Sequence, residues 1–583
     1  MSHTSTHGNA AASHAVAYPT HRPAIMAGQA AVASSHYLAT TAGMRVLQQG
    51  GNVVDAGVAT GLCLNVLQPH LTSLGGVAPV ILHLAAERRT VVIDGLGVWP
   101  RAASIDYFLE HHGGDMPEGI LRSIAPAAAD AWLTALEMFG TLTFEQVSAS
   151  AIELAERGFP MYTSLHSDLT AAPDAFQRWP STAEVLMPGG QVPALGQLLV
   201  QRDLARTLRR MVEAEQAGGI PAVRDFFYRG DIARAMAEFC QEQGGLLTYD
   251  DLANYRVRVE EPVTSEYRGY VVSACGPWCQ GPVVNQTLTI LEHFDLSGLS
   301  HNGAAYVHTL AEALKLAFAD RERYYGDPAL VDVPMAALLS PDYARSRAGQ
   351  IDPTRAWPDM PPPGDPWRGT AGGRDAAQAA SPARDEPWPL DTGYLCAADA
   401  AGNLFSATPS DSARSTPMVP GLGLIISPRG SQSWFDPQHA SALQPGKRPR
   451  LTPNPALAFR DGRPYMAFGT PGGDMQCQAM VQMFVNMVDF GMGPQQAIEA
   501  PRFMTESFPG SFWPHTCHPG RLNVEARIPE PVRAELAERG HDVHLWPDYA
   551  RAASSLCAIV LDPVTGTLSA GADPRRENYA LGW

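Results

Sequence analysis

The feature that most constrains this chain is the junction near residue 391, where a stretch poor in core-forming residues runs directly into a strand pattern. Residues 351–391 hold nine prolines, four glycines and seven alanines among 41 positions. Such a stretch buries too little apolar surface to offset the entropy of ordering it, so we predict that it is flexible. Residues 392–408 then show the pattern of a β-hairpin, with turn residues at 399–403. The junction is therefore either a domain linker or a processing site.

Charge and composition exclude several classes of function. The formal net charge of −17 repels phosphate backbones, so nucleic acid is not an expected partner. No stretch approaches the roughly 20 apolar residues that cross a bilayer, and the first thirty residues lack the basic start and apolar run of a secretory signal. We therefore expect no membrane association and a cytoplasmic location. The eight cysteines are scattered along the chain, which favours free buried thiols over a disulfide framework.

Local patterns predict both helices and strands. Glycine and proline together make up 53 + 49 = 102 residues, which favours many turns over a helical bundle. Apolar periodicity and capping signals predict two buried helices within 44–66 jointed at Gly50-Gly51, strands at 77–84 and 90–94, a capped helix from Thr143, a helix with one core-facing side over 306–323, and a helix over 479–490. Residues 1–30, rich in His, Ala and Ser, are expected to form a loose tail.

Thr392 gains a chemical meaning if the bond between Asp391 and Thr392 is cut. The threonine hydroxyl would then share a residue with a free α-amine, whose reference pKa of about 7.7 to 8.0 suits a general base. One residue would supply both nucleophile and base. Gly472-Gly473 precede a predicted helix, and glycine amides at such a turn can point at a developing oxyanion. The alternative for the glycines is an ordinary tight turn between strand and helix.

Motifs for metals and nucleotides are absent or weak. There is no GxxxxGK[ST] loop, no GxSxG and no HExxH, and Cys275 and Cys279 have the wrong spacing for a zinc knuckle. The run His515–His518 lacks a second ligand cluster. The chemistry proposed for Thr392 uses only protein groups, so we expect neither a metal nor another cofactor.

Several segments match one known family in order along the chain. They are Gln49–Asp55, Leu246–Tyr255, Tyr267–Tyr270, Leu316–Arg321 with Gly326-Asp327, Asp391–Asn403, Gly446–Pro449, Gly469–Gly473 and Glu499–Phe503. The segment around Thr392 has a threonine, a short strand and then Asp-x-x-Gly-Asn. From about residue 30 to the C-terminus, the chain resembles the γ-glutamyltransferase family.

This resemblance implies an N-terminal-nucleophile hydrolase, an α+β protein with a four-layer αββα sandwich formed jointly by two subunits of one self-cleaving proenzyme. The large subunit would span 31–391 after the tail, and the small subunit 392–583. Thr392 would be the nucleophile, Ser410 would assist it in place of a second threonine, and Gly472 and Gly473 would form the oxyanion hole. An acyl-enzyme on Thr392 would pass its acyl group to water or to a second amine.

The positions that contact substrate depart from the family pattern. Classical members hold the α-carboxylate of a γ-glutamyl group with an arginine and its α-ammonium with Asn, Gln and Asp. Here Leu96 stands at the arginine position, with Arg101 nearby but out of register. The asparagine, glutamine and aspartate positions are occupied by Ser412, by Arg429, and by Gln432 or Ser433. A supporting serine pair becomes Leu451-Thr452.

An arginine in place of an ammonium acceptor should repel a free α-amine and attract a carboxylate. We therefore expect an amide hydrolase of the γ-glutamyltransferase-like branch, in which oxamate amidohydrolases and cephalosporin acylases are relatives. Its small-molecule substrate would carry an acyl carboxylate but no α-ammonium. One alternative is a true γ-glutamyltransferase or glutathione hydrolase that uses Arg101 or other loops. Another is a catalytically silent binding relative.

Overall fold

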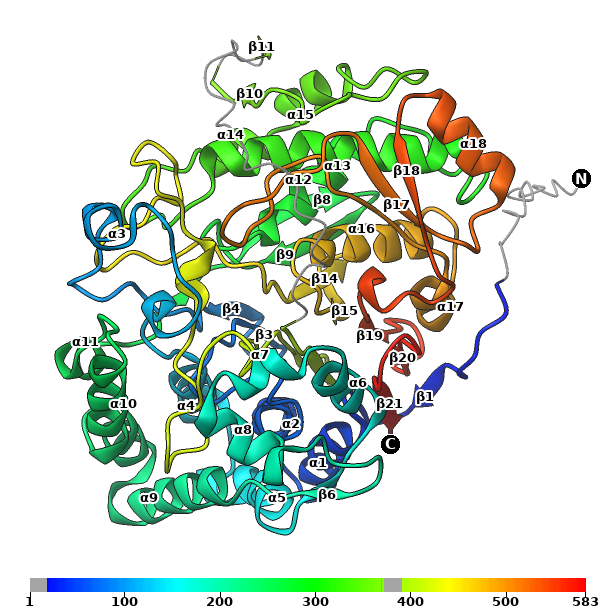
Figure 1. Cartoon of the computed structure of the whole chain (residues 1–583). Coiled ribbons are helices and arrows are strands. Elements are labelled where there is room, and N and C mark those ends of the chain that lie inside the picture. Colours follow the sequence, from blue (N-terminus) through cyan, green and yellow to red (C-terminus); the bar gives the residue numbers. More distant parts are fainter. Residues whose placement is uncertain (1–17, 368–369, 372–390) are drawn as a thin grey trace, which may run out of the picture.

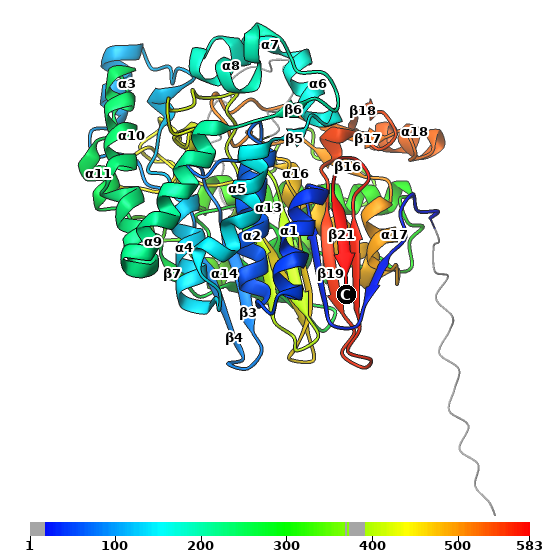
Figure 2. The same cartoon turned by 90° about the horizontal axis from the view of Figure 1, so that it is seen from below.

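Two seven-stranded antiparallel sheets stack face to face, and helices cover both outer faces (Figures 1 and 2). In the computed structural model, residues 18–367, 370–371 and 391–583 are described. The first sheet has the order β1 (Ile25–Ala27), β20 (Leu568–Ala572), β19 (Cys557–Leu561), β15 (Arg463–Gly469), β14 (Ala456–Arg460), β9 (Tyr270–Ala274), β8 (Val263–Tyr267). The second has the order β21 (Tyr579–Gly582), β2 (Ala30–Ser34), β12 (Leu395–Asp399), β13 (Leu404–Ala407), β3 (Val80–Leu84), β4 (Arg89–Ile93), β7 (Val259–Glu260).

Smaller sheets border the sandwich. They consist of β16 (Phe503–Thr505), β17 (Arg521–Glu525) and β18 (Asp542–Trp546); of β5 (Phe159–Pro160) and β6 (Leu198–Leu199); and of β10 (Gly364–Asp365) and β11 (Thr370–Ala371).

The helices form the two outer layers. Against the second sheet lie α1 (Tyr37–Gln48) and α2 (Val53–Leu67), backed by α4 (Ala128–Phe139), α5 (Phe144–Arg157) and α9 (Arg202–Tyr228). Against the first sheet lie α12 (Gly281–Leu291), α16 (Met475–Val488) and α17 (Pro494–Glu499), with α13 (Ala304–Tyr324) and α15 (Pro341–Ala348) outside α12. The remaining helices are α3 (Ile105–His112), α6 (Thr163–Ala171), α7 (Pro173–Gln177), α8 (Pro180–Leu186), α10 (Asp231–Glu242), α11 (Tyr249–Ala253), α14 (Met335–Leu338) and α18 (Glu530–Glu538).

Side chains of the central strands alternate between two apolar layers. In β12, Leu395 and Ala397 join the cluster beneath α1 and α2, whereas Cys396 and Ala398 join the cluster between the sheets. A period of two is what a strand buried on both faces requires. The first sheet has its own outer cluster under α12 and α16. Three apolar layers therefore separate four structural layers, and the predicted αββα sandwich is confirmed.

Strands from both sides of residue 391 share the second sheet. Leu395 of β12 pairs with Ser34 of β2 and with Ala407 of β13, and Phe405 of β13 pairs with Leu82 of β3. The hairpin that follows Thr392 therefore lies in the middle of a sheet whose other strands come mostly from earlier in the chain. One interleaved sandwich accounts for the length without a domain boundary at 391.

Most predicted elements are confirmed. The two helices jointed at Gly50-Gly51, the two early strands, the hairpin after Thr392 and the capping box at Thr143 all occur. The helix predicted from residue 479 begins earlier, at Met475. All eight cysteines are free thiols, as predicted. Within the described residues, no helix has both the length and the apolar character needed to span a bilayer.

The prediction of a loose tail over residues 1–30 is wrong for residues 18–30. Residues 1–17 lie outside the described part of the chain, but the Tyr18 hydroxyl is 3.0 Å from Nδ1 of His301. Strand β1 pairs with β20, and β2 begins at Ala30. Main-chain pairing gives this segment order despite its composition, because ladder hydrogen bonds need no apolar side chains.

The prediction that all of 351–391 is flexible is wrong for residues 351–367. Their backbone bonds to buried charged groups of α13: Lys315 Nζ donates to Trp357 O at 2.9 Å, and Gly364 N donates to Asp320 Oδ1 at 2.8 Å. Helix α13 is buried on nearly all sides, not on one face as its pattern predicted. Polar anchoring replaces the apolar burial that the segment lacks. Residues 372–390 lie outside the described part of the chain.

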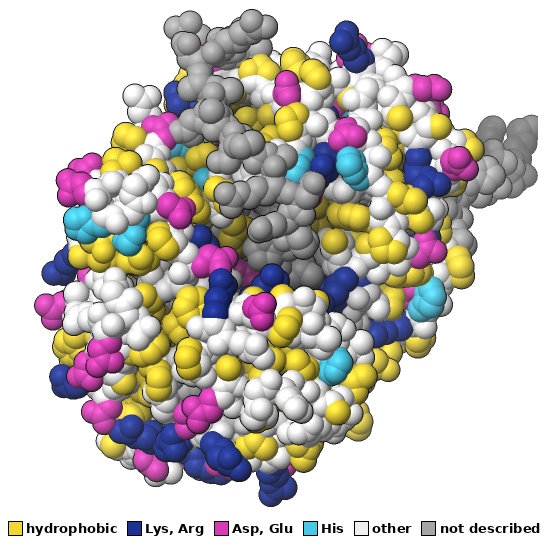
Figure 3. Space-filling view, viewed as in Figure 1, with side chains coloured by type: hydrophobic (Ala, Val, Ile, Leu, Met, Phe, Trp, Pro, Cys, Tyr) yellow, Lys and Arg dark blue, Asp and Glu magenta, His cyan; other side chains and the backbone are white. Residues whose placement is uncertain are grey.

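Charged side chains of both signs intermingle on the face shown in Figure 3. On α9, Arg210 pairs with Asp231 at 2.6 Å, and Arg209 forms an ion pair with Glu156.

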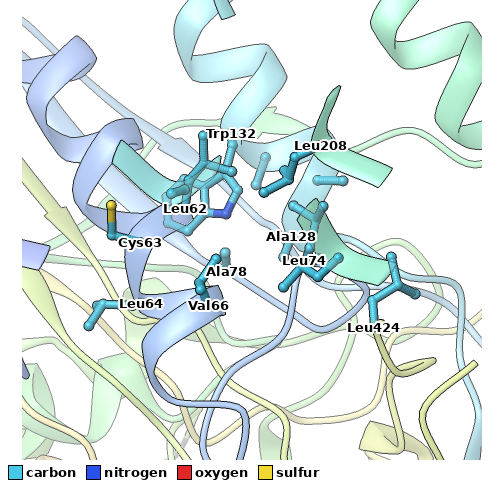
Figure 4. Close-up of a cluster of buried hydrophobic side chains, with 14 of the residues drawn as sticks. Leu62, Cys63, Leu64, Val66, Leu74, Ala78, Ala128, Trp132, Leu208 and Leu424 are labelled. Atoms are coloured by element: carbon cyan, nitrogen blue, oxygen red, sulfur yellow. The ribbon is translucent and has the colours of Figure 1, made fainter. Parts of the chain in front are cut away.

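Close packing of α2 depends on glycine. A Cβ atom at Gly57 would lie 2.3 Å from Cδ1 of Phe405 in β13, and one at Gly61 would lie 2.6 Å from the Trp132 ring. Trp132 lies beside Leu62 of α2 in the buried cluster (Figure 4). The two glycines allow α2 to approach both the sheet beneath it and the helix beside it.

We predict that Gly57→Ala lowers the free energy of unfolding by about 1 to 3 kcal/mol, because the added methyl overpacks the interface with Phe405. Urea unfolding of the purified protein measures this change. Gly28→Ala is the matched control, since a Cβ atom there meets nothing within 4 Å; its effect should stay within about 0.5 kcal/mol. Equal stability of the two variants would contradict the packing argument.

Candidate active site

Thr392 is held at the entrance to β12 by main-chain pairing. It forms an antiparallel bridge with Ser410, and Ser410 forms another with Val77. Gly393 N donates to Pro409 O at 2.9 Å. Thr392 and Ser410 are both fully buried. Main-chain pairing at the start of β12 therefore fixes Thr392 and Ser410 opposite each other.

The two hydroxyls are within hydrogen-bond distance. Thr392 Oγ1 and Ser410 Oγ are 2.9 Å apart, and Thr392 Oγ1 also donates to Oδ1 of Asp391 at 3.3 Å. Ser410 Oγ donates to the main-chain oxygen of Asp391. The predicted nucleophile, its predicted helper and the predicted cleavage point thus form one hydrogen-bonded group.

Arg429 is the buried cation of this group. It begins the short 3-10 helix Arg429–Gln432. Its Nη2 lies 2.8 Å from Oδ2 of Asp391, and its Nε donates to Oδ1 of Asp411. Burial lowers the pKa of Arg429 and the carboxylates of Asp391 and Asp411 raise it, with a net upward shift. The third nitrogen, Nη1, is buried and has no hydrogen-bond partner among the described residues.

Asp411 was not predicted from the sequence. Its backbone is in the left-handed region, with φ of 100°, which is costly for a residue other than glycine. Its amide donates to Asp391 O at 3.1 Å, and its Oδ2 accepts from Ser427 Oγ. Its position next to Ser410 in the sequence was the only available signal.

The turn at Gly472 and Gly473 requires glycine at both positions, with φ of 122° and 56°. Among the described residues, neither glycine amide has a hydrogen-bond acceptor. The ring of Phe512 lies between this turn and the arginine: it is 5.3 Å from Cζ of Arg429, and a Cβ atom at Gly473 would lie 3.7 Å from it. The glycine turn and the arginine therefore face a common aromatic ring, which sequence reasoning missed.

A buried polar network fixes the glycine turn from behind. Gln280 Nε2 donates to Gly473 O at 2.8 Å and to Thr452 O at 2.9 Å, and its Oε1 accepts from Arg321 at 3.0 Å. Arg321 also forms an ion pair with Asp474, the residue after the turn. Buried charges in this network are paired, as burial demands.

The other predicted substrate contacts are arranged unevenly. Gln432 Nε2 donates to Thr452 Oγ1 at 2.9 Å, so these two predicted contacts bond to each other. The Ser412 hydroxyl accepts from Arg414 N at 3.0 Å within its own loop. Arg101 is exposed, and its backbone amide donates to Asp251 at 3.1 Å. In the described part of the chain, neither Ser412 nor Arg101 bonds to Thr392 or Arg429.

In the described residues, one cluster of potential metal ligands occurs, and none of its members belongs to the predicted active site. His308, Glu312 and His541 are buried with ligand atoms within 4.8 Å of one another. Lys315 lies 2.8 Å from Glu312, and the two histidines bond to each other at 2.9 Å. The lysine already neutralises the carboxylate, and the group anchors residues 352–357, so we interpret it as structural.

The αββα sandwich with a threonine at the start of a central strand defines the class of N-terminal-nucleophile hydrolases. Residues 39–583 match the family model described as Gamma-glutamyltranspeptidase. The glutathione hydrolase-like YwrD proenzyme of Bacillus subtilis (strain 168) is 32% identical over 94% of this chain and 98% of its own length. The acylase ACY 1 proenzyme of Pseudomonas sp. (strain SE83) is 35% identical, with 93% and 91% covered.

A solved structure agrees with these relatives. The crystal structure of cephalosporin acylase from Bacillus halodurans matches with a TM-score of 0.84 and 30% identity, covering 99% of each chain. The chain belongs to the gamma-glutamyltranspeptidase family. It is an enzyme of the type that hydrolyses amide bonds or transfers acyl groups.

We predict that Arg321→Met lowers the free energy of unfolding by about 3 to 5 kcal/mol, because it leaves Asp474 buried without its cation. Thermal or urea unfolding measures the loss. Arg323→Met is the matched control two residues along the same helix, where the side chain is exposed; it should change stability by less than about 0.5 kcal/mol. A similarly small loss of stability in both variants would contradict this prediction.

Proposed function

We propose that this protein is a self-processing amidohydrolase whose substrate has an acyl group bearing a carboxylate and no α-ammonium. The bond between Asp391 and Thr392 is cut, Thr392 becomes the N-terminus of a small subunit, and its α-amine serves as base for its own hydroxyl. The names of two relatives, acylase ACY 1 and cephalosporin acylase, support amide hydrolysis as the reaction.

The reaction has two halves. Thr392 Oγ1 attacks the amide carbonyl carbon of the substrate while the α-amine takes its proton, and that proton leaves on the departing amine as the C–N bond breaks. Water then attacks the resulting ester, which releases the carboxylic acid and restores the hydroxyl. Ser410, 2.9 Å from Thr392 Oγ1, holds the nucleophile in place. The free amides of Gly472 and Gly473 suit the oxyanion of each step.

The substrate class is inferred from the position of the Asp391 carboxylate. That carboxylate lies 2.8 Å from Arg429 Nη2 in the uncut chain. After cleavage Asp391 ends the large subunit and can leave. This frees one N–H of Nη2, whose other N–H bonds to Ser410 Oγ, beside Nη1, which has no partner among the described residues. Two adjacent N–H groups of one guanidinium bind a carboxylate bidentately. A substrate carboxylate would therefore take the place of the aspartate.

The same geometry disfavours a γ-glutamyl group. Its α-ammonium would enter next to a buried guanidinium, and like charges at short range repel strongly. The Asp411 carboxylate already accepts hydrogen bonds from Arg429 and Ser427. Among the described residues, the exposed Arg101 makes no hydrogen bond to the group around Thr392; its backbone amide bonds to Asp251 instead. A true γ-glutamyltransferase therefore lacks support at the ammonium end of the glutamyl group.

The first prediction from this proposal concerns processing. Purified wild-type protein should give two bands on a denaturing gel, the smaller beginning Thr-Gly-Tyr-Leu by N-terminal sequencing. Thr392→Ala should stay a single chain, because it lacks the hydroxyl that attacks. An uncut wild-type chain, indistinguishable from Thr392→Ala, would instead favour a catalytically silent binding relative.

The second prediction concerns substrate choice. Processed enzyme should hydrolyse glutaryl-p-nitroanilide with kcat/KM about 10 to 100 times that for valeryl-p-nitroanilide, since a charge-assisted hydrogen bond contributes about 1.5 to 3 kcal/mol. γ-Glutamyl-p-nitroanilide should be slower than the glutaryl amide, because it adds the ammonium. Oxamate and succinyl amides test the distance from amide to carboxylate. Efficient turnover of the γ-glutamyl compound alone would overturn the substrate assignment.

A further inference from the structure

We propose that Arg429, Ser410 and the amide of Asp411 form a second oxyanion site, which catalyses the cleavage between Asp391 and Thr392 and is distinct from the Gly472-Gly473 turn. The inference rests on the proposed function only in taking that bond as the one that is cut. It gives Arg429 two successive uses: it first holds the chain's own carbonyl and aspartate, and later the carboxylate of the substrate.

Three donors converge on the main-chain oxygen of Asp391, the carbonyl that self-cleavage must attack. Ser410 Oγ donates to it, Asp411 N donates at 3.1 Å, and Arg429 Nη2 donates at 3.3 Å. A carbonyl oxygen has two lone pairs, so three donors around it exceed what an ordinary strand-end carbonyl needs. They suit the negative charge that a tetrahedral intermediate places on this atom.

The donors are fixed before reaction begins. Asp411 keeps a backbone φ of 100°, which points its amide at Asp391 O and its carboxylate at Arg429. A strained residue at such a position is typical of a functional site. Asp391, Thr392, Ser410, Asp411 and Arg429 are all at least nine-tenths buried, so water competes little for these hydrogen bonds. In the described residues, no hydrogen bond joins either glycine amide of the 472–473 turn to Asp391 O.

Cleavage needs no reactant from outside the chain other than water. Thr392 Oγ1 forms a bond to the carbonyl carbon of Asp391 and gives its proton to Oδ1 of that aspartate, its acceptor at 3.3 Å. The oxyanion on Asp391 O is held by the three donors. The C–N bond then breaks as the proton passes to the Thr392 nitrogen, which leaves an ester and a free amine. Water hydrolyses the ester to a C-terminal carboxylate on Asp391 and a hydroxyl on Thr392.

Among the described residues, the charged groups that act on the Asp391 carboxylate are Arg429, which forms an ion pair with it, and the nearby Asp411. Burial raises the pKa of Asp391 and the nearby Asp411 raises it further, whereas Arg429 opposes the shift, and the net direction is upward. Because the carboxylate must be unprotonated to take the proton, cleavage should slow as the pH falls through this raised pKa. The slowing should begin at a higher pH than the reference aspartate value of about 3.9 would give.

The test follows full-length precursor made by cell-free translation, with cleavage timed on denaturing gels and no substrate added. Arg429→Met should cut about 100-fold more slowly or worse, which is the usual loss of one oxyanion donor. Arg429→Ala should regain measurable cleavage when millimolar guanidinium is added. Asp391→Asn should lower the rate and abolish its dependence on acidic pH. Arg414→Ala is the control, because Arg414 is an exposed arginine in the loop that follows Asp411. Its cleavage rate should match that of the wild type.

Resistance to limited proteolysis shows which precursors are folded. The proposal is wrong if folded Arg429→Met is cut at the wild-type rate. It is also wrong if guanidinium fails to restore cleavage to folded Arg429→Ala, because the arginine would then act only through structure. The substrate assignment is separate: normal, arginine-dependent cleavage with no turnover of carboxylated amides would refute that assignment and leave this proposal intact. A wild-type chain that never cuts would refute both.

Discussion

The position of the β12–β13 hairpin in the middle of the second sheet governs the rest of this structure. Strand β12 takes its hydrogen bonds from β2 on one side and β13 on the other, so neither sheet nor sandwich is complete without residues from both sides of Thr392. A chain cut before folding would have to assemble a central strand between two others. Folding first and cutting afterwards avoids that problem, because the ladder already holds the new terminus in place.

A second constraint follows from burying the junction. Placing Asp391 and Asp411 in the interior requires a cation, since two unpaired carboxylates would cost several kcal/mol each. Arg429 meets this need with Nε on one carboxylate and Nη2 on the other. Its geometry therefore follows from the uncut chain as much as from any substrate. Loss of Asp391 from this seat would leave Arg429 paired with Asp411 alone, with donor groups free to bind another carboxylate.

Sequence reasoning worked where the signal was local. Period-two patterns, the joint at Gly50-Gly51 and the capping box at Thr143 each depend on neighbouring residues, and all are confirmed. The failures involve contacts between distant segments. Residues 351–367 lack apolar side chains but bond to buried charges of α13, and the one-sided pattern of that helix gave no sign of those charges being buried.

The candidate site shows the same division. Thr392 and the glycine turn were identifiable from short motifs, and Ser410 from the family resemblance. The contact of Phe512 with Arg429 depends on the whole sandwich. The sequence suggested that Arg429 would attract a substrate carboxylate, and the structure shows it already holding two carboxylates of the chain itself. That difference changes the physical question. Under the proposed function, a substrate carboxylate would take a place beside Arg429 that the Asp391 carboxylate already fills in the uncut chain.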